Sequence, residues 1–186
     1  DIGKISIPDE ILNKPGRLTA EEFAVIKGHS MAGANMLSEL PLDQKEEPLV
    51  KTAYEICRWH HERYDGGGYP DGLKGEEIPV SAQVVALADV YDALTSERCY
   101  KDAYSHEKAI EMILAGQCGA FNPLMLECLL DISSSLKKKM GYKSKERYEQ
   151  TDLSDIASRF HDFEMDSSEK IVQQLEFERM RYNFLA

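Results

Sequence analysis

Apolar residues recur at every third or fourth position through most of the first 140 or so residues, and no stretch alternates between polar and apolar side chains. A repeat of 3.6 residues places apolar side chains on one face of a helix, whereas a half-buried strand needs a repeat of two. At 186 residues, the chain is long enough for one domain with a sizeable core. The sequence therefore predicts an all-α bundle.

Helix caps and chain breakers divide this pattern into five predicted helices. Thr19-Ala-Glu-Glu22 is a capping box, in which the Thr and Glu side chains satisfy backbone donors at a helix start. Asp65-Gly-Gly-Gly68 is a strong breaker. The predicted helices run from residue 20 to residue 40, from about Glu46 to Tyr64, from Ser81 to Ser96, from the cap Ser105, and from Asn122-Pro123 to the residues before Gly141.

The composition changes after Gly141, and residues 142–186 have only a diffuse apolar stripe. Ile171, Leu175, Tyr182 and Leu185 stand at heptad-like spacing, but Glu178 interrupts the seam. We expect this segment to be a helical extension that links the domain to a further one. A short coiled-coil contact that makes a homodimer is the alternative.

Charge and cysteine content exclude several classes of function. The net charge is −11, which argues against a protein that coats DNA or RNA polymers, although it allows a small, locally basic ligand site. No stretch is apolar for long enough to insert into a membrane. The four cysteines lack a C-x-x-C spacing, so we expect free thiols and a cytoplasmic location. The sequence begins with Asp1 rather than Met, so we expect a fragment of a longer protein.

Several side chains that bind metals stand at predicted helix ends or faces, namely Asp1, His29, His60, His61 and Asp89. Each taken alone has an ordinary structural explanation, and two adjacent histidines on a helix point about 100° apart. The glycine-dense run from Asp65 to Gly72 fits a loop whose backbone approaches a ligand, but Pro-Asp-Gly also fits a plain turn. Spacing alone leaves these alternatives open.

A resemblance to a known family extends this interpretation. The motifs that carry it stand in the order Asp1-Ile-Gly-Lys4, Ile7-Pro8-Asp9, Lys14-Pro15-Gly16, His29, His60-His61-Glu62, Asp65 to Gly72, and Ala88-Asp89-Val90-Tyr91-Asp92-Ala93-Leu94-Thr95-Ser96. Over roughly residues 1–141 they closely resemble the HD-GYP family. The resemblance implies an HD-type bundle of five or more helices with a C-terminal helical extension. It also implies metal-dependent hydrolysis of cyclic di-GMP to linear pGpG, and further to GMP, in bacterial second-messenger signalling.

The resemblance also implies roles for individual residues. The metal ligands would be Asp1, His29, His60, His61 and Asp89, with Asp1 bridging two ions. Asp1 and Lys4 would be catalytic, with Lys4 near the scissile phosphate. The substrate-binding residues would be Arg98, Lys101, Gly68, Tyr69 and Pro70. Two divalent ions are implied, with iron or manganese expected first and zinc as the alternative. Mixed imidazole and carboxylate ligands suit these three metals better than calcium or magnesium, but the residue types do not choose among the three.

Some positions depart from the family pattern and leave other functions open. No histidine precedes Asp1, Cys99 stands where a proline is common, and Asn122 stands where an aspartate is common. We therefore expect this fragment to be impaired or inactive. The alternatives are an impaired HD-GYP signalling module that docks GGDEF-domain proteins, and a phosphohydrolase that acts on another cyclic dinucleotide.

Overall fold

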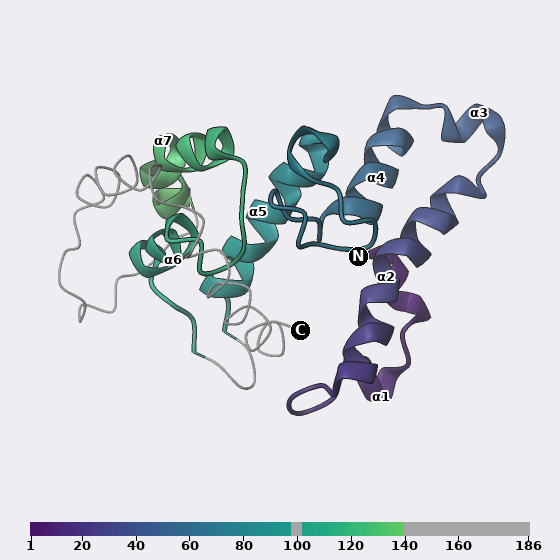
Figure 1. Ribbon diagram of the computed structural model, residues 1–186, viewed down its shortest axis with the longest axis horizontal. Coiled ribbons are helices and arrows are strands. Elements are labelled where there is room, and N and C mark those ends of the chain that lie inside the picture. Colours follow the sequence, from purple (N-terminus) through teal and green to yellow (C-terminus); the bar gives the residue numbers. More distant parts are fainter. Residues whose placement is uncertain (98–101, 140–186) are drawn as a thin grey trace.

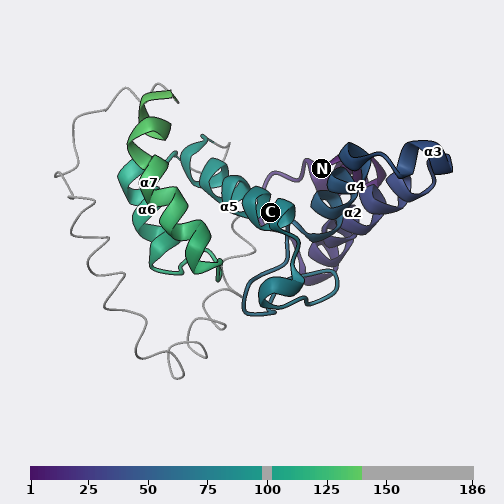
Figure 2. The ribbon, with the colours of Figure 1, turned by 90° about the horizontal axis from the view of Figure 1, so that it is seen from above.

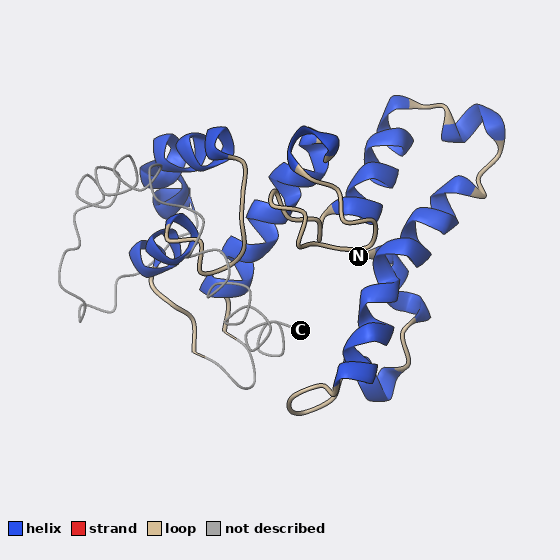
Figure 3. Ribbon diagram, viewed as in Figure 1, coloured by secondary structure: helices blue, strands red, loops and turns tan. Residues whose placement is uncertain are grey.

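The computed structural model describes residues 1–97 and 102–139, and every regular element longer than a single bridge in these ranges is a helix (Figure 3). The all-α prediction is therefore confirmed for this part of the chain. Arg98, Lys101 and the predicted extension 142–186 lie outside the described residues. The elements are η1 (Ile2–Ser6), α1 (Asp9–Leu12), α2 (Ala20–Ser38), α3 (Leu42–Lys45), α4 (Pro48–Trp59), η2 (Gly75–Glu77), α5 (Val80–Thr95), α6 (His106–Leu114) and α7 (Pro123–Lys139).

The helix starts lie where the sequence predicts them. Thr19 caps α2 with both hydrogen bonds of a capping box, since its hydroxyl accepts from the backbone of Glu22 and the Glu22 carboxylate accepts from the backbone of Thr19. The Ser105 hydroxyl caps α6, and the Asn122 side chain accepts from Leu124 at the start of α7. These caps satisfy backbone donors that lack intrahelical partners.

One predicted helix is longer than the observed one. The sequence predicts a helix from about Glu46 to Tyr64, but α4 ends at Trp59 and His60 is its C-cap residue. The chain leaves the helix because the Glu62 carboxylate turns inward and accepts hydrogen bonds from the loop that follows. This early end changes where the two adjacent histidines point.

The helices form two groups that α5 connects (Figures 1 and 2). At one end of the molecule α2 packs against α4 and η1, and at the other end α6 packs against α7. Helix α5 contacts α4 on one side and both α6 and α7 on the other. In the described part of the chain, no helix combines the length and the apolar character that crossing a bilayer requires.

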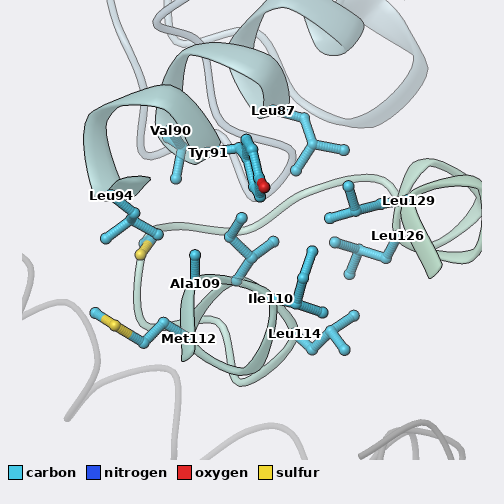
Figure 4. Packing of buried hydrophobic residues seen from close by; sticks show 12 residues of the cluster. Leu87, Val90, Tyr91, Leu94, Ala109, Ile110, Met112, Leu114, Leu126 and Leu129 are labelled. Carbon is cyan, nitrogen blue, oxygen red and sulfur yellow. The ribbon is translucent and has the colours of Figure 1, made fainter. Parts of the chain in front are cut away.

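The main apolar core lies between α5, α6 and α7 (Figure 4). Leu94, Ile110 and Ile113 are almost completely buried there. A polar chain also crosses this core, because His106 hydrogen-bonds to the Tyr91 hydroxyl through Nδ1 at 2.7 Å and to the Ser133 hydroxyl through Nε2 at 2.8 Å. Burial lowers the pKa of His106, so this histidine is a neutral structural bridge between the three helices.

Candidate metal centre

Three histidines converge at the other end of the molecule. His29 comes from the middle of α2, His60 caps the C-terminus of α4, and His61 begins the turn that follows. One ring nitrogen from each lies within 4.8 Å of the corresponding nitrogens of the other two. The early end of α4 makes this possible, since the rings of His60 and His61 lie 4.0 Å apart instead of pointing to separate faces of a helix.

Backbone hydrogen bonds orient two of these rings. His29 donates from Nδ1 to the Ile26 carbonyl at 2.7 Å, and His60 donates from Nδ1 to the Ile56 carbonyl, also at 2.7 Å. A carbonyl oxygen only accepts, so in the neutral rings each Nδ1 carries the proton and each Nε2 carries a lone pair. This is the arrangement in which metal-binding histidines are usually held.

The two Nε2 atoms lie 3.4 Å apart. If both rings are neutral, two lone pairs face each other and neither nitrogen can donate to the other. A metal ion between them satisfies both lone pairs, and two ligands of one ion can stand at this separation. The donor set therefore fits a divalent metal ion.

Burial keeps the cluster uncharged at neutral pH. Desolvation, with a smaller effect of the neighbouring His29 ring, lowers the pKa of His60 to about 4. Desolvation also lowers the pKa values of His29 and His61, and His60 adds to the effect on His61. A metal ion that binds near pH 7 therefore has no proton to displace from these rings.

These pKa shifts predict that the metal-free chain loses stability in acid. In the unfolded chain the histidines take up protons below about pH 6.5, whereas folded His60 does so only near pH 4. The unfolded state therefore binds more protons between these values, and the free energy of unfolding falls as pH is lowered. Urea unfolding with a chelator at pH 7 and pH 5 should show a loss of a few kcal/mol at most. A His60→Gln variant should show a smaller loss, and equal stability of the original chain at both values would contradict the prediction.

Asp1 faces two of the histidines. Its Oδ1 atom lies 3.4 Å from Nε2 of His29 and 3.8 Å from Nε2 of His60. Its Oδ2 atom lies 2.9 Å from the ammonium of Lys4, a residue of the 3-10 helix η1 for which Asp1 is the N-cap residue. The structure therefore brings both predicted catalytic residues to the histidines.

Gly3 allows this approach, because η1 lies directly on α2. A Cβ atom on Gly3 would stand 2.0 Å from the backbone oxygen of His29 and 2.4 Å from the backbone nitrogen of Gly33. Both neighbours are backbone atoms of α2 and cannot move aside. Gly3 and Gly33 thus allow η1 to lie close to α2, which places Asp1 and Lys4 beside the cluster.

Asp89 lies on α5 and is exposed. Its oxygen atoms are not part of the group of three nitrogens, but its charge acts to raise the pKa of both His29 and His60. The carboxylate is therefore near the cluster without touching all its members. Of the predicted ligands, the three histidines and Asp1 lie close together, and Asp89 lies further from the cluster.

The loop after α4 adds an aromatic side to the site. The Tyr69 ring stacks on His61, with ring centres 4.8 Å apart and planes 24° from parallel, and the Tyr69 backbone nitrogen donates to the His61 carbonyl. Pro70 follows through a cis peptide bond. Gly68 is required for the close approach, because a Cβ there would stand 2.3 Å from the backbone nitrogen of Arg63. The structure therefore places Tyr69, between Gly68 and Pro70, beside the cluster, and the substrate-binding role of these three residues stays a prediction. Arg98 and Lys101 lie outside the described residues.

Two anchors of this loop were not predicted from the sequence. The buried Glu62 carboxylate accepts hydrogen bonds from three consecutive backbone nitrogens, those of Asp71, Gly72 and Leu73, at 2.7 to 3.1 Å. Asp71 in turn binds the Arg58 guanidinium through two hydrogen bonds and accepts a third from the Trp59 indole. For the first anchor, the sequence signal was the acidic residue directly after the histidine pair. Asp71 gave no comparable signal, because Pro-Asp-Gly is also consistent with a plain turn.

Comparisons with known proteins agree with this geometry. A family profile described as an HD domain matches residues 1–121. The chain is 46% identical over 136 residues to a probable cyclic di-GMP phosphodiesterase of Vibrio cholerae, which covers 70% of this chain and 30% of that protein. It is 43% identical over 141 residues to the cyclic di-GMP phosphodiesterase response regulator RpfG of Xanthomonas campestris, covering 76% of this chain and 36% of that protein. A 3'3'-cGAMP-specific phosphodiesterase 2 of Vibrio cholerae is 41% identical over 131 residues, covering 70% of this chain and 24% of that protein.

Proposed function

Because the chain belongs to the HD domain family, we propose that it is a metal-dependent phosphodiesterase that hydrolyses cyclic di-GMP to linear pGpG and then to GMP. The observation that carries the proposal is the convergence of His29 and His60, whose Nε2 lone pairs face each other beside Asp1. Relatives named as cyclic di-GMP phosphodiesterases support it. The chain spans about a third or less of the length of these relatives, so the activity is inferred for the part they share.

We propose that two divalent ions bind here, held by His29, His60, His61, Asp1 and Asp89. HD domain phosphohydrolases bind divalent metals, and this set of imidazole and carboxylate donors suits iron, manganese or zinc better than calcium or magnesium. We propose iron or manganese first and zinc as the alternative. When bound, such ions act as Lewis acids toward a phosphodiester and lower the pKa of water to near neutrality.

The protein's own side chains supply binding and proton transfer. The Lys4 ammonium lies on the exposed side of Asp1, where it can donate a proton to the ribose oxygen that leaves phosphorus. Asp1 orients Lys4 through its second oxygen atom while its first faces the histidines. Tyr69, with Gly68 and Pro70, forms the wall against which the nucleotide lies. Arg98 and Lys101 are proposed to hold the substrate phosphate.

Two alternatives remain as candidate functions. A substrate other than cyclic di-GMP is favoured by the relative named as 3'3'-cGAMP-specific. The second is an impaired signalling module that docks GGDEF-domain proteins, and the close arrangement of all three histidines favours the enzyme over this alternative. A cytoplasmic location, a domain at 1–141 and a helical extension at 142–186 with a homodimer contact belong to the same proposal.

Hydrolysis of a small nucleotide panel tests the function. The manganese-loaded chain should convert cyclic di-GMP to pGpG at the reduced rate expected of an impaired fragment. Chromatography follows the product, and addition of a chelator should stop the reaction. Preferential conversion of 3'3'-cGAMP would show that the substrate is this dinucleotide and not cyclic di-GMP. Metal binding without hydrolysis of any cyclic dinucleotide would favour the docking module.

The Asp89→Ala variant tests the outermost proposed ligand. Loss of this carboxylate should reduce metal stoichiometry and lower turnover by about a hundredfold, while the helical content stays unchanged because Asp89 is exposed. The measurement is elemental analysis after dialysis, with circular dichroism on the same sample. Asp92→Ala is the matched control, since Asp92 is an exposed acid one turn further along α5. Unchanged stoichiometry in Asp89→Ala would remove Asp89 from the ligands.

A further inference from the structure

A lysine on α2 is held at the edge of the site by two aromatic rings. The Lys27 ammonium lies 4.8 Å from the centre of the Phe23 ring and 5.4 Å from the centre of the Tyr69 ring. Tyr69 is the ring that stacks on His61. Lys27 is therefore one aromatic ring away from the histidine cluster.

The charge of Lys27 is not neutralised by a carboxylate. Within residues 1–97 and 102–139, its ammonium has neither an ion pair nor a hydrogen bond, and it lies over the two rings. Lys4, by contrast, is paired with Asp1 at 2.9 Å, and Lys14 with Glu22 at 2.6 Å. Contact with aromatic rings holds a cation in place without cancelling its charge. Although the chain has a net charge of −11, such a lysine attracts an anion locally.

We propose that Lys27 binds the second phosphate of a cyclic dinucleotide, the one that is not cleaved. This inference rests on the proposed function, in which the first phosphate lies at the histidine cluster. The two phosphates of such a ligand are separated by a ribose, so a second cation must stand beside the cluster and not within it. The Tyr69 ring contacts both places, since its centre lies 5.4 Å from the Lys27 ammonium and 4.8 Å from the centre of the His61 ring. Lys27 thereby distinguishes nucleotides with two phosphodiester groups from those with one.

Binding of two ligands to three variants tests this assignment. The ligands are cyclic di-GMP and 3',5'-cyclic GMP, which has the same base but one phosphate. The dissociation constants are measured by equilibrium dialysis with the metal-free chain in the presence of a chelator, so that neither ligand is hydrolysed. Lys27→Gln should weaken the binding of cyclic di-GMP about tenfold, the effect of losing one charge-assisted hydrogen bond, and that of cyclic GMP less than about twofold. Lys27→Arg should restore most of the lost affinity. Lys45→Gln on α3, which removes the same charge from another half-buried lysine, should leave both constants unchanged.

Three results would overturn the assignment. An unchanged constant for cyclic di-GMP in Lys27→Gln would show that the ammonium does not contact it. Equal weakening of both ligands would show that Lys27 only positions Tyr69. Failure of the original chain to bind cyclic di-GMP would also exclude the contact. Formation of pGpG, measured separately, decides the proposed function, since selective binding without product would contradict that function and leave the Lys27 contact standing.

Discussion

Replacing His60 with alanine should lower metal affinity at least about a hundredfold and abolish hydrolysis at micromolar metal. His60 supplies a Nε2 lone pair that faces both His29 and Asp1, and its Nδ1 is fixed by the Ile56 carbonyl. Removing it leaves the cluster with one nitrogen donor fewer, and Nε2 of His29 then faces only Asp1. Isothermal titration with Mn²⁺ and elemental analysis after dialysis measure the loss.

The matched control for this prediction is another buried histidine, His106. The His106→Ala variant leaves the Tyr91 and Ser133 hydroxyls buried without their partner, so it should lower the free energy of unfolding by about 2 to 4 kcal/mol. Its metal content should stay unchanged, because His106 lies between α5, α6 and α7, in the core apart from the cluster. Equal metal loss in both variants, or unchanged metal content in His60→Ala, would contradict the account.

The Gly68→Ala substitution should have the second largest effect. A Cβ at this position would stand 2.3 to 2.5 Å from backbone atoms of Glu62 and Arg63. Because backbone cannot give way as a side chain does, the loop must move and Tyr69 must leave its stack on His61. We expect a loss of about a hundredfold in kcat/KM, with stability lowered by about 1 to 3 kcal/mol.

Gly67→Ala is the control for the loop, because the two glycines are adjacent but differ in what surrounds them. A Cβ on Gly67 would meet only the Asp65 side chain, whose nearest oxygen stands 3.2 Å away and belongs to a flexible group. This variant should keep its stability to within about 1 kcal/mol and most of its activity. If Gly68→Ala were as active as Gly67→Ala, close packing of the loop on the histidine turn would not be needed for function.

Much of the fold was predictable from local signals. Caps at Thr19, Ser105 and Asn122 depend on side chains that bond to backbone within three residues, so the sequence shows them directly. The candidate metal ligands were predicted from motifs, and the structure brings three of them, the histidines, together with Asp1. The role of Arg98 and Lys101 stays a prediction, since these residues lie outside the described ranges.

The features that could not be predicted depend on contacts between distant residues. Helical periodicity extends α4 to Tyr64, but the hydrogen bonds of Glu62 to the loop end it at Trp59 and turn His60 and His61 toward one side. Gly3 stands in the motif Asp1-Ile-Gly-Lys4, but the reason for a glycine there appears only when η1 is seen against the backbone of α2. The contact of Lys27 with Tyr69 likewise joins two segments that are far apart in the sequence.

Anomalous diffraction from crystals of the chain grown with Mn²⁺ tests the central claim most directly, because it locates the ion without reference to activity. The account predicts an anomalous peak within coordination distance of Nε2 of His29, Nε2 of His60 and the Asp1 carboxylate. An ion bound only elsewhere on the acidic surface, with the histidine nitrogens still facing one another and no metal between them, would contradict it.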